Sequence, residues 1–114
     1  MIKLKSELVP VTVSNLRGGT GDIVREELFS PDETFGKTTV CAVITIPDGS
    51  SIGEHPHGPD AELYYILSGS LRITDNGITK DLTAGDSVFT GDGKTHSVVN
   101  VSGKNATMLA VVVK

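Results

Sequence analysis

An all-β fold, either a sandwich or a closed barrel, is the class that this sequence predicts. Its 114 residues include thirteen glycines and five prolines but only three Phe, two Tyr and no Trp, which indicates many tight turns between short strands. Runs of β-branched and aliphatic residues recur between Gly, Asp, Asn or Pro, and no stretch sustains a helical periodicity. The length fits one domain, residues 1–114.

Ten segments of the chain fit short strands. In order they span residues 8–13, 22–29, 37–46, 51–57, 62–67, 71–74, 78–82, 87–90, 96–101 and 107–113. The third segment ends at Pro47-Asp48-Gly49, a sequence that can reverse the chain. Asp75-Asn76-Gly77 separates the sixth segment from the seventh, and Asn-Gly readily takes the positive φ angles of a tight hairpin. Turns at such short intervals favour a barrel or sandwich over any helical fold.

All three histidines of the chain lie in one spaced pattern that has two parts. The first part reads Gly49, five residues, His55-Pro56-His57, four residues, Glu62, six residues, Gly69. The second part reads Gly85, five residues, Gly91-Asp92-Gly93, two residues, His96, three residues, Asn100. Three imidazoles and one carboxylate are the donor set of a divalent first-row metal whose other positions stay open to water or substrate.

The alternation of side chains along a strand predicts which residues accompany these donors. Side-chain direction repeats every two residues, so each donor shares its face with its neighbours two positions away. The faces expected to point into the barrel carry His55 with His57, Glu62 with Tyr64 and Ile66, and His96 with Val98 and Asn100. We therefore expect Tyr64, Ile66 and Val98 to contact a substrate. Tyr64 has a second interpretation, an aromatic core residue with a satisfied hydroxyl.

The two parts of the pattern resemble the two motifs of the cupin superfamily. The first motif matches at Gly49, His55, His57, Glu62 and Gly69. The second matches at Gly85, Gly93, His96 and Asn100, whereas Gly91 stands where the family usually has proline. Two multi-residue patterns in the right order are much harder to meet by chance than one short motif.

The resemblance implies a cupin-type jelly-roll β-barrel, also called a double-stranded β-helix, in a single small domain. Residues 37–114 would form the barrel core with both motifs, and residues 1–36 would supply N-terminal strands. Similar small cupins often carry their N-terminal strand across to a partner subunit, so we expect a homodimer and treat 1–36 as a candidate for exchange. Apolar outer faces such as the run 108–113 could be covered by that partner.

The resemblance also implies a metal held by the four residues that match the family ligands, namely His55, His57, Glu62 and His96. Manganese and iron are favoured, while zinc, nickel, cobalt and copper also suit these donors. One carboxylate against a divalent ion leaves the site net positive, which attracts a small anionic oxygen ligand such as a carboxylate or an enolate.

Composition limits the partners and the location of the chain. The formal net charge of −4 argues against nucleic acid and against an anionic membrane surface. No apolar run approaches the length of a membrane span, and the first residues lead into polar sequence, so we expect cytoplasmic residence.

Two functional hypotheses follow. The first is a metalloenzyme of dioxygenase, oxalate-decarboxylase-like or isomerase type that acts on a carboxylate-bearing or enolisable molecule. The second is a metal-containing binding or sensing module without turnover, because the sequence does not single out a second acid or base near the metal. One architecture hosts many reactions, so the fold alone does not choose between them.

A few further residues have an open role. The string Arg17-Gly18-Gly19-Thr20-Gly21 is interpreted first as a flexible connection, second as a cradle for an anion, and it is also a candidate dimer hinge. Four acids lie near the motif turns, and most of them are expected to be solvated turn residues, although a second acid or base could be among them: Glu54, Asp60, Asp86 and Asp92. Arg25 is expected on the strand surface, unless the register differs by one residue.

Overall fold

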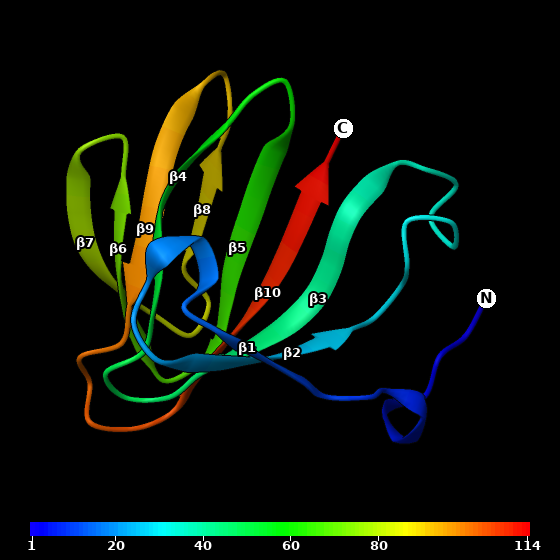
Figure 1. The fold of residues 1–114 in the computed structure, drawn as a ribbon, viewed down its shortest axis with the longest axis horizontal. Coiled ribbons are helices and arrows are strands. Elements are labelled where there is room, and N and C mark those ends of the chain that lie inside the picture. The colour runs from blue at the N-terminus through cyan, green and yellow to red at the C-terminus, as the bar shows by residue number, and fades with distance from the viewer.

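The computed structural model describes residues 1–114, and its ten strands form two antiparallel sheets (Figure 1). The six-stranded sheet has the order β1 (Val11–Ser14), β2 (Asp22–Glu27), β3 (Thr38–Ile46), β10 (Ala106–Val113), β5 (Ala61–Ser68), β8 (Ser87–Thr90). The four-stranded sheet has the order β4 (Ser51–His57), β9 (Lys94–Val99), β6 (Ser70–Asp75), β7 (Ile78–Thr83). This is the expected all-β jelly-roll, and each of the ten predicted strands is present.

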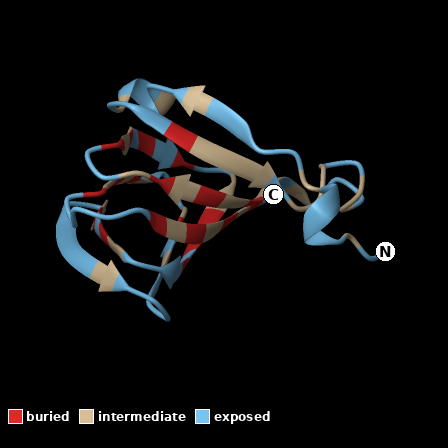
Figure 2. Cartoon of the chain, turned by 90° about the horizontal axis from the view of Figure 1, so that it is seen from below, coloured by how far each residue is buried: buried red, intermediate tan, exposed pale blue.

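The core lies between the two sheets, where buried residues face one another (Figure 2). Strand β10 is an example, because Ala106, Met108, Ala110 and Val112 are buried while the residues between them are partly exposed. This alternation is the period of two that an extended strand requires. Burial of apolar side chains on one face of each sheet therefore fixes the pairing register of neighbouring strands. The same register sets the positions of His55, His57, Glu62 and His96.

The two turns expected from the sequence are present. Asn76 and Gly77 have φ angles of 48° and 83° and connect β6 to β7 as a two-residue hairpin. Gly49 has a φ of 82°, and the Ser50 amide donates to the Pro47 carbonyl at 3.0 Å. This turn brings the chain from the end of β3 to the start of β4.

The N-terminal segment differs from the expectation. Strand β1 begins at Val11 rather than residue 8, and a short 3₁₀ helix, η1 (Lys5–Glu7), precedes it. A second 3₁₀ helix, η2 (Leu16–Gly18), follows β1, and β2 then pairs with β3 of the same chain. Figure 1 shows η1 and the N-terminus projecting away from the barrel. Neither helix is long or apolar enough to cross a membrane.

Candidate metal centre

The four predicted donors come from three strands and both sheets. His55 and His57 lie on β4, His96 lies on the neighbouring strand β9, and Glu62 lies on β5 of the six-stranded sheet. His55 and His96 are directly opposite each other in the β4–β9 pairing. Pro56, between the two β4 histidines, is exposed, whereas all four donors are buried. The alternation predicted for this segment is confirmed.

The ligand atoms of these residues converge on one point. The Nε2 atoms of His57 and His96 each lie 3.0 Å from Glu62 Oε1, and His55 Nε2 lies 3.9 Å from it. The two Nε2 atoms of His55 and His96 are 3.0 Å apart. One ligand atom from each residue can be chosen so that all four are within 4.8 Å of one another.

These distances fit a divalent metal ion. Ligand atoms at right angles around an ion, each about 2.1 Å from it, lie about 3.0 Å from one another. His57 Nε2 is buried and makes no hydrogen bond, although it is 3.0 Å from Glu62 Oε1. A buried polar atom without a partner calls for an explanation, and coordination of an ion supplies one here. The cluster could therefore hold a metal.

Two histidines are oriented by contacts to their other ring nitrogen. His55 Nδ1 is 2.7 Å from the Gly53 carbonyl oxygen, and His57 Nδ1 is 3.1 Å from Asp60 Oδ1. With the proton on Nδ1, each ring donates a hydrogen bond to its oxygen partner. Nε2 then carries no proton, and its lone pair is free to coordinate a metal. Asp60 is thus a positioning residue of the centre. It differs from the solvated role expected for most of the turn acids, because its carboxylate contacts a buried imidazole.

Glu62 remains ionised in this setting. Burial alone raises the pKa of its carboxyl group, but interactions with the imidazoles of His55, His96 and His57 more than offset burial and lower the pKa to about 2. A carboxylate is therefore available at neutral pH. It is the only anionic donor in the cluster.

Tyr64 packs directly against the centre. Its ring stacks on the His96 ring with a centroid separation of 4.6 Å and an interplanar angle of 7°. Burial, and next the negative charge of Glu62, raises the pKa of the Tyr64 hydroxyl well above its usual value. The hydroxyl therefore keeps its proton at neutral pH and can only donate or accept hydrogen bonds. Tyr64 belongs to the core, as one interpretation of the sequence expected, and it also lines the adjoining cavity. Its contact with a substrate stays a prediction.

A cavity of about 130 Å³ opens beside the donors. It is lined by Leu16, Arg17, Arg25, Val40, Ile44, Ile52, His55, His57, Glu62, Tyr64 and Val112. Sites for drug-sized ligands are larger, about 300–1,000 Å³, so this cavity favours a small occupant. Ile66 and Val98 are buried in the core and are not among the lining residues. A substrate contact by these two residues stays a prediction.

Comparison with known proteins places this centre in a family. Residues 42–112 match the model of the cupin domain. The chain belongs to the cupin family. An oxalate-binding protein of Thermotoga maritima is 37% identical over 113 residues, which cover 99% of this chain and 93% of the relative.

Solved structures agree with this assignment. The crystal structure of a predicted oxalate decarboxylase from Thermotoga maritima matches this cupin with a TM-score of 0.95 and 37% identity, covering 99% of this chain and 98% of that one. A cupin superfamily protein from Desulfitobacterium hafniense, at 23% identity, has a TM-score of 0.66 and covers 80% and 76% of the two chains. The second likeness shows the fold alone.

The departure from the family motif at Gly91 has a steric explanation in this cupin. A Cβ atom at Gly91 would lie 2.8 Å from the Ala61 Cβ, because the loop before β9 passes close to the start of β5. The glycine therefore permits a close approach of two segments, both of which adjoin the donor residues.

Two of the residues that line the cavity are arginines, Arg17 and Arg25. Arg17 was expected chiefly in a flexible connection and Arg25 on the strand surface, yet both line the cavity beside the donors. The signal for Arg25 was the alternation of β2, which places it on the same face as buried Ile23. The glycine-rich string that begins at Arg17 had an anion cradle as its second interpretation, but its place beside the cavity depends on how η2 packs against β4.

Proposed function

We propose that this cupin holds a divalent metal, with manganese or iron favoured, at His55, His57, Glu62 and His96, and binds a small anionic molecule beside it. The occupant would be a carboxylate-bearing or enolisable molecule, with oxalate as the first candidate. We further propose a metalloenzyme of dioxygenase, oxalate-decarboxylase-like or isomerase type. The convergence of the four buried donors on one point beside a cavity is the observation that carries the proposal.

The chemistry of the donors supports an anionic oxygen ligand. A bound divalent ion acts as a Lewis acid toward an oxygen of its ligand, and Glu62 neutralises only one of its two charges. The small cavity favours an occupant with few heavy atoms. The relative that is called an oxalate-binding protein, and the similar structure described as a predicted oxalate decarboxylase, support oxalate as the first ligand to test.

One observation favours the alternative, a non-catalytic binding or sensing module. Decarboxylation of oxalate to formate must deliver a proton to the carbon that loses carbon dioxide. Glu62 is the only carboxylate that lines the cavity and is itself a donor of the cluster. Tyr64 is a poor acid, because burial and the charge of Glu62 raise the pKa of its hydroxyl. An ordinary general acid is therefore missing from the cavity wall.

Metal and ligand binding test the proposal directly. The purified protein is reconstituted with Mn(II) or Fe(II), its metal content is measured by elemental analysis, and oxalate binding is measured by calorimetry. We expect about one equivalent of metal, oxalate binding that requires the metal, and loss of both in His96→Ala. Less than about a tenth of an equivalent after reconstitution would contradict the metal assignment.

Turnover separates the enzyme from the binding module. The loaded protein is incubated with oxalate under air and under anaerobic conditions, and formate and carbon dioxide are measured. Product formation that His96→Ala abolishes supports the oxalate-decarboxylase-like enzyme. Tight binding of oxalate without product in either condition supports the module, with other small acids and enolisable substrates tested next.

A homodimer is proposed through the outer face of the six-stranded sheet. Its outward-pointing apolar residues, named here the outer patch, are Leu63, Tyr65, Leu67, Phe89, Leu109 and Val111. Phe89 is 63% exposed and Tyr65 is 41% exposed, which is unusual for a contiguous apolar surface facing water. Exchange of residues 1–36, cytoplasmic residence and the absence of a nucleic-acid partner stay predictions.

A further inference from the structure

We propose that Arg17 and Arg25 form the anion-recognition wall of the metal cavity and select a ligand with two anionic groups over one with a single carboxylate. The inference rests on the proposed function, because it concerns the ligand held beside the four donors. It assigns a role to two residues that lie outside both cupin motifs.

Strand β2 brings Arg25 to the cavity. Alternation places Arg25 on the same face as Ile23, a residue of the hydrophobic core, and Arg25 lies opposite Ile44 of β3, which also lines the cavity. Arg25 is half-buried, and its side chain makes neither an ion pair nor a hydrogen bond. A guanidinium whose five donors have no bonded acceptor is suited to receive an anionic ligand.

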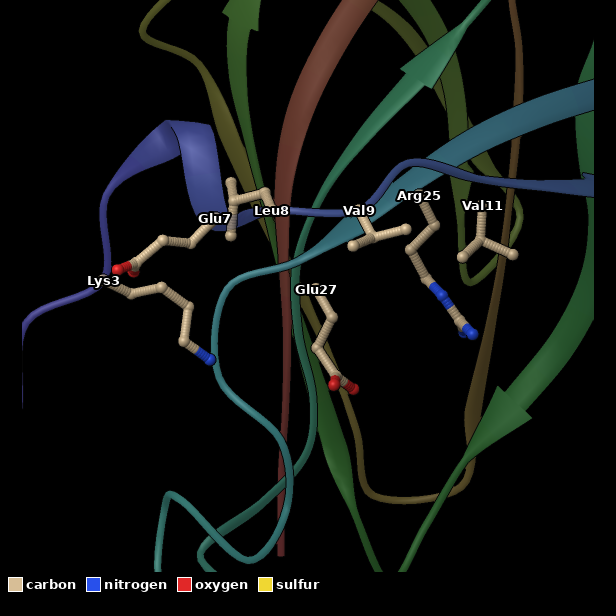
Figure 3. Close-up of a pocket in the computed structure, with 7 residues that line it drawn as sticks. All are labelled: Lys3, Glu7, Leu8, Val9, Val11, Arg25 and Glu27. Atoms are coloured by element: carbon tan, nitrogen blue, oxygen red, sulfur yellow. The ribbon is translucent and has the colours of Figure 1, made fainter.

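Arg25 also stands at the edge of a second recess, which Figure 3 shows. Glu27, two residues further along β2, lines that recess and is the nearest candidate partner on the same strand. In Figure 3 the two side chains extend without meeting, and no ion pair joins them. The positive charge of Arg25 is therefore not neutralised by its own strand.

Helix η2 brings Arg17 to the same cavity. The turn that contains Arg17 packs backbone to backbone against β4, the strand of His55 and His57. A Cβ atom at Gly53 would collide with the Arg17 carbonyl oxygen, and one at Gly19 would collide with the Ser51 carbonyl oxygen. Two glycines thus permit a contact that no other residue type would allow, and this contact holds η2 in place.

The backbone of Arg17 adopts an uncommon conformation. Its φ angle is 55°, in the left-handed region that residues other than glycine rarely adopt. Its side chain makes no ion pair, and its charge is close enough to lower the pKa of the buried Tyr64 hydroxyl, although burial dominates that pKa. A strained, unpaired arginine beside a donor cluster is typical of a binding site.

The charge of the cavity indicates what the two arginines recognise. A divalent ion, two guanidinium groups and the single carboxylate of Glu62 leave three positive charges without a partner in the wall. A monocarboxylate neutralises one of them. A small dicarboxylate neutralises two, with one end toward the donors and the other within reach of guanidinium hydrogen bonds, so it is the better match.

The test compares oxalate with acetate on the Mn(II)-loaded protein. Dissociation constants are measured by calorimetry for the unmodified protein, Arg17→Gln, Arg25→Gln and the control Arg72→Gln. Arg72 pairs with exposed Asp81 on the four-stranded sheet and does not line the cavity. We expect each cavity variant to weaken oxalate binding about tenfold to hundredfold, because a hydrogen bond to a charged group is lost. Acetate binding should change less than about threefold.

Two further measurements distinguish recognition from damage to the fold. Metal content by elemental analysis should stay equal to that of the unmodified protein, and Arg17→Lys should recover part of the oxalate affinity because it restores the charge. Equal losses for oxalate and acetate, or no loss for oxalate in both glutamine variants, overturns the assignment. Failure of the proposed function looks different, because the unmodified protein would then not bind oxalate, and that result overturns both proposals.

Discussion

Asp60 is a residue outside the donor set that orients one of the donors, His57. Its carboxylate contacts Nδ1 of His57 and so holds the ring with Nε2 toward the other donors. Such carboxylate–histidine contacts raise the basicity of the imidazole and fix its orientation. The loop between β4 and β5 therefore contributes to the site although no cupin motif position falls on Asp60.

Removal of this carboxylate should weaken metal binding without unfolding the protein. We expect Asp60→Ala to lower the affinity for Mn(II) about tenfold to hundredfold, because His57 loses its fixed orientation. The affinity can be measured by competition with a chelating dye. Glu54→Ala is the matched control, since Glu54 is exposed on the same segment and makes no ion pair. Equal affinities of both variants would show that Asp60 does not position His57.

The donor residues were predictable from the sequence, but their surroundings were not. Spacing and alternation within β4, β5 and β9 are local properties, and they predicted the four residues that converge and the face on which Tyr64 lies. Arg17 and Asp60 reach the site through packing between segments distant in sequence or through a loop conformation. No periodicity records such contacts, so an anion cradle was only the second interpretation of the Arg17 string, and Asp60 was not distinguished from the other turn acids.

At the scale of elements, Asn100 joins the end of β9 to two other parts of the fold. Its side-chain amide donates to the carbonyl oxygens of Ile46 and Lys104, at 2.7 and 2.6 Å. Its side-chain oxygen accepts from the amide and the hydroxyl of Ser102, at 2.9 and 2.7 Å. Asn100 is fully buried, so this motif residue acts in the architecture rather than at the metal.

Replacing Asn100 by alanine should therefore destabilise the fold. We expect Asn100→Ala to lower the free energy of unfolding by about 2–4 kcal/mol, because the buried Ile46 carbonyl and three partly buried contacts lose their partner. Urea unfolding followed by circular dichroism measures this change. Asn105→Ala is the control, since Asn105 is exposed and its side chain makes no hydrogen bond. A change below about 0.5 kcal/mol for Asn100→Ala would contradict the structural role.

Strand positions were predictable because apolar alternation and turn residues are local signals. Strand boundaries were less so, as β9 begins at Lys94 rather than residue 96, where backbone pairing with β4 continues past the apolar run. The helices η1 and η2 were missed, because three residues are too few to produce a helical period. The packing of η2 on β4 depends on Gly19 and Gly53, whose role appears only when both segments are in place.

For the whole molecule, the outer patch predicts association. We expect the unmodified protein to be a dimer, and Tyr65→Lys to shift it to monomer, because the charge would be buried at the centre of the interface. Size-exclusion chromatography with light scattering measures the mass. Ile78→Lys is the control, since Ile78 is also apolar and exposed but lies on β7 of the other sheet. A monomeric unmodified protein would contradict the dimer.

Because the four donors come from both sheets, a bound ion would affect the stability of the folded protein. Three donors belong to the four-stranded sheet and Glu62 to the six-stranded sheet, so an ion bound by all four would tie the sheets together. Ligands that bind only the folded state add to its stability in proportion to the logarithm of their free concentration. At low metal concentration the free energy of unfolding would be smaller, and the barrel would be more susceptible to proteolysis. The folded fraction of this cupin would then depend on the free metal concentration.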